Sequence, residues 1–182
     1  MITSYDISDK TSMMSRGEID TLKKYARKLP TNAIAIIIGA GTGTSSLAIM
    51  EERTDITIFS VDIAFPTAGM YEPGEKENLK RAGMWDSGNV IQILGNSQRI
   101  GKIWPYRYDM IFIDGDHRYE FVKQDVNLWI PRAKKNAIVM FHDYGSKEIK
   151  PHSGVKDAVD EILLDKWKKV DYNRWLLVLE RK

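Results

Sequence analysis

The chain has 182 residues, a length that suits one well-buried domain and is too short for two ordinary domains with a linker. Its 27 basic and 25 acidic residues are scattered and leave a formal charge of +2, so a strong electrostatic field for nucleic acid is not expected. The absence of cysteine excludes disulfides and thiolate sites, and the lack of a leader or a long apolar run predicts a cytoplasmic protein that does not enter a membrane.

The N-terminal part of the chain predicts one helix before the first strand. Ser15 and Glu18 have the S-x-x-E spacing of a capping box, and apolar residues then recur at helical period, so we expect a helix over 16–29. A proline ends this helix. The β-branched, apolar run AIAIII at 33–38 predicts a strand that is buried on both faces.

Strands and helices then alternate along the chain. Further strands are expected over 56–62, 90–94, 109–114 and 137–141, and helices over 45–52, 75–83, 98–104 and 119–129, with a last helix through the apolar residues Val155, Ala158, Val159, Ile162 and Leu163. This alternation requires right-handed crossovers and a parallel sheet with helices on both faces. Two last strands, 167–172 and 174–180, are separated by a tight turn and must form an antiparallel hairpin. We therefore predict a single α/β domain with an N-terminal helical segment, 1–32, and a core over 33–182.

A glycine-rich loop, Gly39-Ala40-Gly41-Thr42-Gly43, joins the first predicted strand to a helix. Ligands bind at such loops because the strand ends leave a crevice and the helix start offers free N–H groups. Dinucleotide binding uses G-x-G-x-x-G, and the third glycine position is Thr44 here, so a nicotinamide cofactor is not favoured. Asp62 ends the next strand, where a carboxylate can bind ribose hydroxyls, and Ile63 beside it offers an apolar surface to an adenine.

Five ionisable residues follow the fourth and fifth predicted strands: Asp114, Asp116, His117, His142 and Asp143. Neighbouring parallel strands open into one crevice at their carboxyl ends, so we expect these groups to converge beside the glycine loop. Clustered charges cost free energy unless a metal or a catalytic role accounts for them. This part of the sequence therefore predicts an active site.

The chain resembles the small class I S-adenosylmethionine-dependent methyltransferases. The likeness is to a group that includes macrocin-type sugar O-methyltransferases, cephalosporin hydroxylase-like proteins and, more distantly, catechol O-methyltransferase. It runs from about Ser15 to Tyr144 through IIIGAGTGTSS, FSVDI, ILGNS, FIDGDHRYE and MFHDY, in the family's order. The resemblance implies a Rossmann-like methyltransferase fold, with a mostly parallel seven-stranded sheet that ends in an antiparallel hairpin. One departure is Ile37, where many members carry an acid that contacts the cofactor.

The resemblance also implies site residues. S-adenosylmethionine would be bound by Gly39, Ala40, Gly41, Thr42, Gly43, Thr44, Asp62, Ile63, Asn96, Ser97 and Asp114. A divalent cation, Mg²⁺ or Mn²⁺, would be held by Asp114, His142 and Asp143. Imidazole is a poor ligand for Mg²⁺ and a good one for Mn²⁺, Fe²⁺ or Zn²⁺, so either the metal differs from the family's, or His142 does other work and no metal is bound. Asp116 and His117 would act together on the acceptor's proton, with their order left open.

The predicted function is methyl transfer from S-adenosylmethionine to a hydroxyl of a small molecule such as a sugar or a phenol, assisted by the cation. An iron-dependent, hydroxylase-like enzyme and a cofactor-binding module without catalysis are the alternatives. The predicted partner is the small-molecule acceptor. Nucleic acid and membranes are not expected, and a homodimer is left open.

Overall fold

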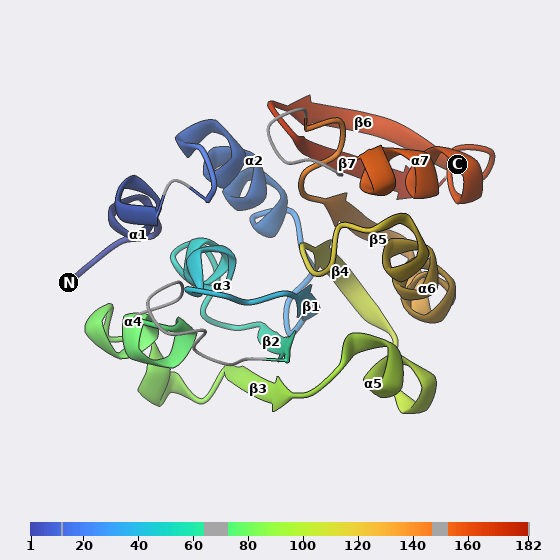
Figure 1. The fold of residues 1–182 in the computed structure, drawn as a ribbon. Helices are drawn as coiled ribbons and strands as arrows, with labels where there is room; N and C mark the ends of the chain where they lie inside the picture. The colour runs from blue at the N-terminus through green and yellow to red at the C-terminus, as the bar shows by residue number, and fades with distance from the viewer. Residues whose placement is uncertain (12, 64–72, 147–152, 182) are drawn as a thin grey trace.

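The computed structural model of the chain describes residues 1–11, 13–63, 73–146 and 153–181. Its centre is a seven-stranded sheet in the order β3-β2-β1-β4-β5-β7-β6 (Figure 1). The strands are β1 Ile34–Ile38, β2 Thr57–Asp62, β3 Val90–Leu94, β4 Tyr108–Ile113, β5 Ala133–Phe141, β6 Trp167–Asn173 and β7 Leu176–Arg181. The first five strands pair in parallel, and β7 pairs antiparallel with both β5 and β6. The predicted mixed sheet and its terminal hairpin are confirmed.

Helices cover both faces of this sheet. They are α1 Ser4–Thr11, α2 Arg16–Ala26, α3 Thr44–Met50, α4 Glu75–Arg81, α5 Ser97–Ile103, α6 Tyr119–Trp129 and α7 Ser153–Ile162, with short 3₁₀ turns at Trp85–Ser87 and Ile130–Arg132. Two buried apolar clusters separate the layers, one formed with α1 to α4 and the other with α5 to α7. Successive residues of each strand point to opposite faces of the sheet, so alternate strand residues belong to different clusters. None of the described helices is long and apolar enough to cross a membrane.

The predicted capping box is present at the start of α2. The backbone N–H of Ser15 donates to Glu18 Oε2 at 2.7 Å, and Ser15 Oγ accepts from the Glu18 N–H at 3.3 Å. The helix ends at Ala26 rather than at 29, because the chain tightens at Lys28 into 3₁₀-type bonding.

Two features of the fold were not predicted. One is α1, whose eight residues are mostly polar and lack a strong apolar period. The other is the start of β5 at Ala133, four residues before the apolar run, through a polar stretch that is largely exposed. Pairing with β4, which shifts register between Tyr108 and Met110, extends the strand there. Tertiary pairing has overridden local composition at this edge.

Candidate active site

The predicted site residues come directly after the strands, and backbone hydrogen bonds align them. The Asp114 N–H donates to the Ile38 carbonyl at 2.8 Å, and the His142 N–H donates to the Ile113 carbonyl at 3.0 Å. On the other side of β1, the Gly39 N–H donates to the Val61 carbonyl at 2.9 Å. These bonds continue the ladder past the strand ends. The glycine loop and the start of the acidic cluster therefore share one edge of the sheet.

The glycine loop is pressed against β4. Gly39 has φ +83°, and a Cβ at this position would lie 2.0 Å from the Asp114 carbonyl oxygen. Gly43, with φ +80°, begins α3, and its Cβ would lie 2.8 Å from Glu75. Only glycine fits both the backbone conformation and the space at these two positions.

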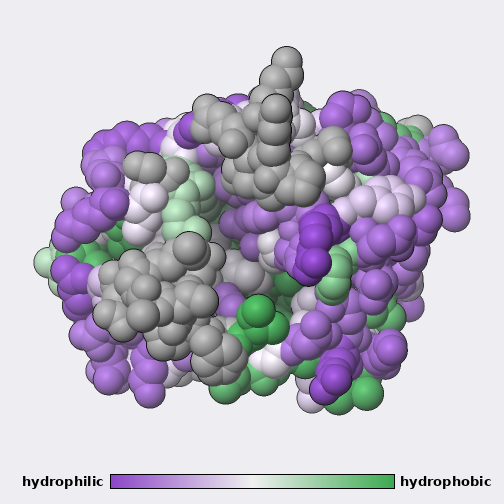
Figure 2. Space-filling model, viewed as in Figure 1, coloured by the Kyte–Doolittle hydropathy of each residue, from purple (hydrophilic) through white to green (hydrophobic). Residues whose placement is uncertain are grey.

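Asp62 and its neighbours form the part of the edge where the ribose and adenine were predicted. The Asp62 carboxylate accepts a hydrogen bond from the Gly41 N–H at 2.9 Å, which ties the strand end to the glycine loop. Ile63 and Leu94, the register partner of Asp62, are each 64% exposed. Figure 2 shows a small hydrophobic area over the ends of β2 and β3, on a face that is otherwise mostly hydrophilic. Exposed aliphatic side chains beside the acid predicted to bind the ribose would suit an adenine ring.

Asn96 and Ser97 begin α5, and both side chains are already bound within the protein. Asn96 Oδ1 accepts from the Arg99 N–H at 3.0 Å, which caps the helix. Ser97 Oγ donates to Asp125 Oδ1 at 2.7 Å, and the Gln98 amide donates to the same oxygen at 3.0 Å. Asp125, on α6, is 1% exposed and was not predicted as part of the site. Its carboxylate holds the start of α5 against α6.

The pKa of Asp125 leads to a first prediction. Burial raises this pKa to about 6, while the hydrogen bonds from Ser97 and Gln98 act in the opposite direction. Because the folded-state pKa lies above the unfolded value, the protonated carboxyl favours folding below about pH 4, and this contribution is lost as the pH rises towards 6. Asp125→Asn should therefore raise the free energy of unfolding near pH 7.5 by about 1–3 kcal/mol. Near pH 4 the variant should match the unmodified protein.

Urea denaturation of both proteins at the two pH values measures this difference. Other carboxyl groups titrate equally in the two proteins, so the comparison isolates Asp125. If the free energies of unfolding of the two proteins change in parallel from pH 4 to 7.5, ionisation of the Asp125 carboxyl does not destabilise the folded protein.

The acidic cluster brings together Asp114, His117 and Asp143. One donor atom from each lies within 4.8 Å of the others, an arrangement that could hold a metal ion. His117 Nε2 is 2.9 Å from Asp143 Oδ2 and 3.5 Å from Asp114 Oδ1. The cluster contains His117, which was predicted to act on the acceptor's proton, beside two of the three predicted metal ligands.

His142 lies behind these carboxylates and is 4% exposed. Its Nδ1 is 3.1 Å from Asp114 Oδ1 and 3.2 Å from Asp143 Oδ2. Its Nε2 points away from them, 3.6 Å from Glu18 Oε1, and makes no hydrogen bond within the described parts of the chain. A buried imidazole in this position can hold both carboxylates in place from the interior of the protein.

Glu18 is a residue of the site that sequence reasoning assigned only to helix capping. Its side chain is 1% exposed, and Oε1 accepts from the Trp175 N–H at 3.1 Å while facing His142. The capping box already accounts for this acid, so no pattern in the sequence indicates its contact with His142. α2, the β6–β7 turn and the end of β5 meet at this carboxylate.

Charge pairing sets the pKa values in the cluster. Hydrogen bonds that the His117 ring donates to the carboxylates of Asp114 and Asp143 raise the pKa of His117 to about 9, against the effect of burial. Burial would lower the pKa of His142, but the charge and hydrogen bonds of the same acids raise it well above its usual value. The two imidazoles in turn lower the pKa values of Asp114 and Asp143 despite burial. The cluster is a compact set of alternating charges.

Asp116 is bound to its neighbour rather than to the cluster. Its carboxylate accepts from the Arg118 side chain at 3.0 and 3.1 Å and from the Arg118 N–H at 2.9 Å. The hydrogen bond from the guanidinium lowers the pKa of Asp116, which makes it a weaker base. Asp116 and His117 thus differ in both partners and basicity.

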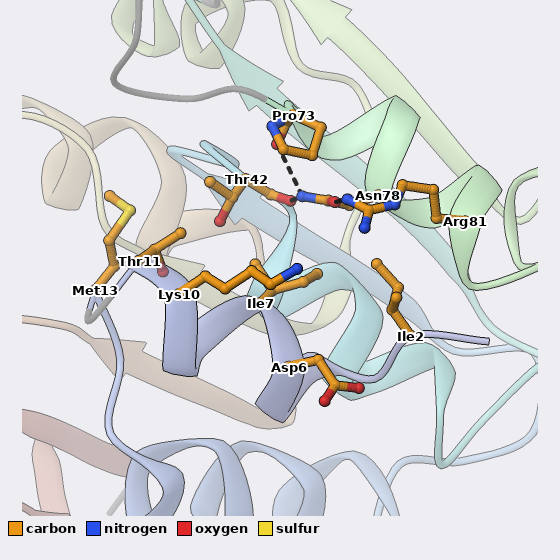
Figure 3. A pocket seen from close by; sticks show the side chains of 10 residues that line it. All are labelled: Ile2, Asp6, Ile7, Lys10, Thr11, Met13, Thr42, Pro73, Asn78 and Arg81. Atoms are coloured by element: carbon orange, nitrogen blue, oxygen red, sulfur yellow. Dashed lines mark hydrogen bonds between the residues drawn. The ribbon is translucent and has the colours of Figure 1, made fainter.

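A cavity of about 420 Å³ lies between α1 and α4 and reaches Thr42 of the glycine loop (Figure 3). The described residues that line it are Ile2, Asp6, Ile7, Lys10, Thr11, Met13, Thr42, Pro73, Asn78 and Arg81. The cluster of Asp114, His117 and Asp143 is not among them. The glycine loop therefore has a concave space on the side of α1 as well as the crevice at the strand ends.

Comparison with known proteins agrees with this arrangement. The family described as a methyltransferase domain matches residues 36–144, which include the glycine loop and the acidic cluster. An uncharacterised protein, R132, of Acanthamoeba polyphaga mimivirus is 29% identical over 143 residues, covering 70% of this chain and 58% of the viral protein. The chain thus spans somewhat over half the length of this relative.

Solved structures share the fold at low sequence identity. A Staphylococcus aureus protein assigned as a caffeoyl-CoA O-methyltransferase is 18% identical, with 98% of this chain and 90% of that chain covered and a TM-score of 0.75. The methyltransferase PaMTH1 of Podospora anserina, solved with S-adenosylhomocysteine, is 18% identical, with 96% and 82% covered and a TM-score of 0.69. CalS11, a TDP-rhamnose 3′-O-methyltransferase of calicheamicin biosynthesis, is 16% identical, with 89% and 76% covered and a TM-score of 0.63.

The match to the family covers more than half of the chain, and the fold superposes on that of solved methyltransferases. The chain belongs to the methyltransferase domain family and has the Rossmann-like fold of the class I methyltransferases.

Proposed function

We propose that the protein transfers the methyl group of S-adenosylmethionine to a hydroxyl of a small molecule, with help from a divalent cation. The observation that carries the proposal is the shared sheet edge, where the glycine loop packs directly on Asp114 of the acid and histidine cluster. A cofactor on the loop and an acceptor on the cluster would then be held side by side. Placing two reactants in this way supplies a large part of the rate of a displacement reaction.

The cofactor would lie along the loop from Gly39 to Thr44, with its ribose at Asp62 and its adenine between Ile63 and the start of α5. Two similar structures, PaMTH1 and a Streptococcus mutans protein assigned as a methyltransferase, contain S-adenosylhomocysteine, which supports this choice of cofactor. Asn96 and Ser97 would line the adenine edge through the backbone of α5, because their side chains are bound elsewhere in the protein. Buried Ile37 cannot make the contact that an acid would, so water or backbone must supply it.

Removing the Asp62 carboxylate should weaken this cofactor site. We expect Asp62→Ala to lower the affinity for S-adenosylhomocysteine by about 1–3 kcal/mol, through the loss of hydrogen bonds to a charged group. Calorimetric titration measures the change. The matched control is Asp55→Ala, before the opposite end of β2, where the carboxylate pairs with Arg53. An Asp62→Ala affinity equal to that of the control would place the ribose elsewhere.

The cluster fits a divalent cation through Asp114, His117 and Asp143, whose donor atoms converge. His142, predicted as a ligand, would instead support the two carboxylates, since its Nδ1 faces both. One imidazole and two carboxylates suit Mn²⁺ better than Mg²⁺. A bound cation would supply positive charge that draws the acceptor's hydroxyl close and makes its proton easier to remove.

The transfer itself is an in-line displacement. The acceptor oxygen forms a bond to the methyl carbon as the bond from carbon to the sulfonium sulfur breaks, and the hydroxyl proton passes to a base. If His117 is a cation ligand, Asp116 would accept this proton; because its pKa is lowered, it would depend on the acidification of the hydroxyl that a bound cation would supply. Without a cation, His117 would be the base, but its pKa of about 9 leaves only a minor neutral fraction near pH 7, so turnover by this route would rise with pH.

Titration of the purified protein with S-adenosylhomocysteine, with and without Mn²⁺ or Mg²⁺, tests the proposal. We expect micromolar binding and a cation-dependent gain in turnover of a hydroxylated acceptor. Absence of cofactor binding under every condition would contradict it. Iron in the purified protein, together with oxoacid-dependent turnover, would favour the hydroxylase-like alternative.

A further inference from the structure

The cavity between α1 and α4 has a positively charged interior. Lys10, on α1, and Arg81, on α4, approach it from opposite walls, and Figure 3 shows both cationic ends directed toward the middle. Neither forms an ion pair within the part of the chain that the structure describes. Two like charges from different elements facing one space are typical of a site that binds an anion.

The acid that lines the cavity, Asp6, offsets these charges only in part, because hydrogen bonds from Thr3 lower the pKa of its carboxyl more than the charge of Lys10 does. Asp6 Oδ2 accepts from the Thr3 N–H at 2.8 Å and from Thr3 Oγ1 at 2.7 Å, which fastens the carboxylate to the start of α1. Figure 3 shows it pointing away from the two cationic ends. The interior of the cavity is therefore left with an excess of positive charge.

A buried amide holds the arginine side of the cavity and links it to the glycine loop. Asn78 is 2% exposed, and its Nδ2 donates to the Thr42 carbonyl at 2.9 Å and to the Pro73 carbonyl at 2.8 Å. Its Oδ1 accepts from Arg81 Nη1 at 3.2 Å. The guanidinium is thus oriented by a residue that is itself fixed to the loop. Pre-oriented donors of this kind bind carboxylates and phosphates with little loss of side-chain entropy.

The remaining walls are apolar and leave room for more than an ion. Ile2 and Ile7 line the cavity beside the cations, and Met13 lies at its rim, 41% exposed. The volume of about 420 Å³ is within the range of small-molecule sites. The lining suits a molecule that has an anionic group and an apolar part.

We propose that this cavity binds the anionic group, a phosphate or a carboxylate, of the small molecule that the enzyme methylates. The inference rests on the proposed function, because it names the chemical class of the acceptor. Since Thr42 belongs to the glycine loop, the carboxylate of the cofactor could offer the same chemistry. The experiment must separate these two sources.

The first arm is titration of the protein with inorganic pyrophosphate at about 0.15 M salt, where weak surface binding is screened. We expect saturable binding that weakens about tenfold in Lys10→Ala and in Arg81→Ala, the loss of roughly one charge-assisted hydrogen bond each. Lys80→Ala is the matched control, because Lys80 is an exposed cation on α4 that does not line the cavity. No saturable binding, or an equal loss in the control, would show that only scattered surface charges are involved.

The second arm repeats the titration with the protein saturated by S-adenosylhomocysteine. Pyrophosphate binding that persists, with cofactor affinity unchanged in the two variants, supports the acceptor as the source. Displacement of pyrophosphate and weakened cofactor binding in Lys10→Ala would assign the cavity to the cofactor's carboxylate and overturn the inference. If the unmodified protein binds no S-adenosylhomocysteine, the proposed function fails, while the first arm still decides whether the cavity binds anions.

Discussion

Gly39→Ala is expected to destabilise the protein by more than about 3 kcal/mol and to abolish cofactor binding. The left-handed conformation alone costs an alanine about 1–2 kcal/mol. Here the added Cβ would also lie 2.0 Å from the Asp114 carbonyl oxygen, so the glycine loop must move away from β4. Overpacking of this kind adds about 1–3 kcal/mol. The same movement would separate the cofactor loop from the cluster.

Gly88→Ala is the control for this substitution. Gly88 has φ +71°, close to that of Gly39, but a Cβ there would meet nothing within 4 Å. It should therefore show the conformational cost of about 1–2 kcal/mol and leave cofactor affinity unchanged. Urea denaturation and calorimetric titration of both variants measure the difference. Equal losses of stability would mean that the loop does not press on β4 as the structure indicates.

Asp143→Asn should have the largest effect on cation binding. Asp143 is 3% exposed, lies 2.9 Å from His117 and supplies one of the three converging donor atoms. Loss of an outer-shell partner typically weakens a metal site about 10–100-fold, and loss of a ligand should cost at least as much. Breaking the buried pair should also lower the free energy of unfolding by roughly 3–5 kcal/mol. Titration with Mn²⁺ and urea denaturation measure the two effects.

A variant of another nearly buried acid separates the loss of the site from a loss of stability. Asp109 is 7% exposed, on β4 near the end away from the cluster, and its carboxylate accepts from the Ile34 N–H and from Lys134. Asp109→Asn should lower stability while leaving Mn²⁺ affinity within about twofold, because it lacks contact with the cluster. Unchanged Mn²⁺ affinity in Asp143→Asn would rule out the assigned ligand set.

The structural features that these four variants test differ in how far the sequence alone predicts them. The need for glycine at 39 and 43 could be anticipated from the loop's position between a buried strand and a helix. The carbonyl that excludes a side chain at Gly39 belongs to Asp114, 75 residues later. No local pattern identifies that neighbour, because it depends on the pairing of β1 with β4.

Sequence periodicity by itself determined the order of strands and helices from 16 onward, because burial on one or both faces leaves a regular spacing of apolar residues. It also determined which residues lie at the strand ends, and hence the loop, Asp62 and the acids and histidines. Only the tertiary structure decided how those residues pair. It turned His142 toward Glu18, bound Asp116 to Arg118 and brought His117 between Asp114 and Asp143. Side-chain partners depend on distances between segments far apart in the chain, which no local spacing encodes.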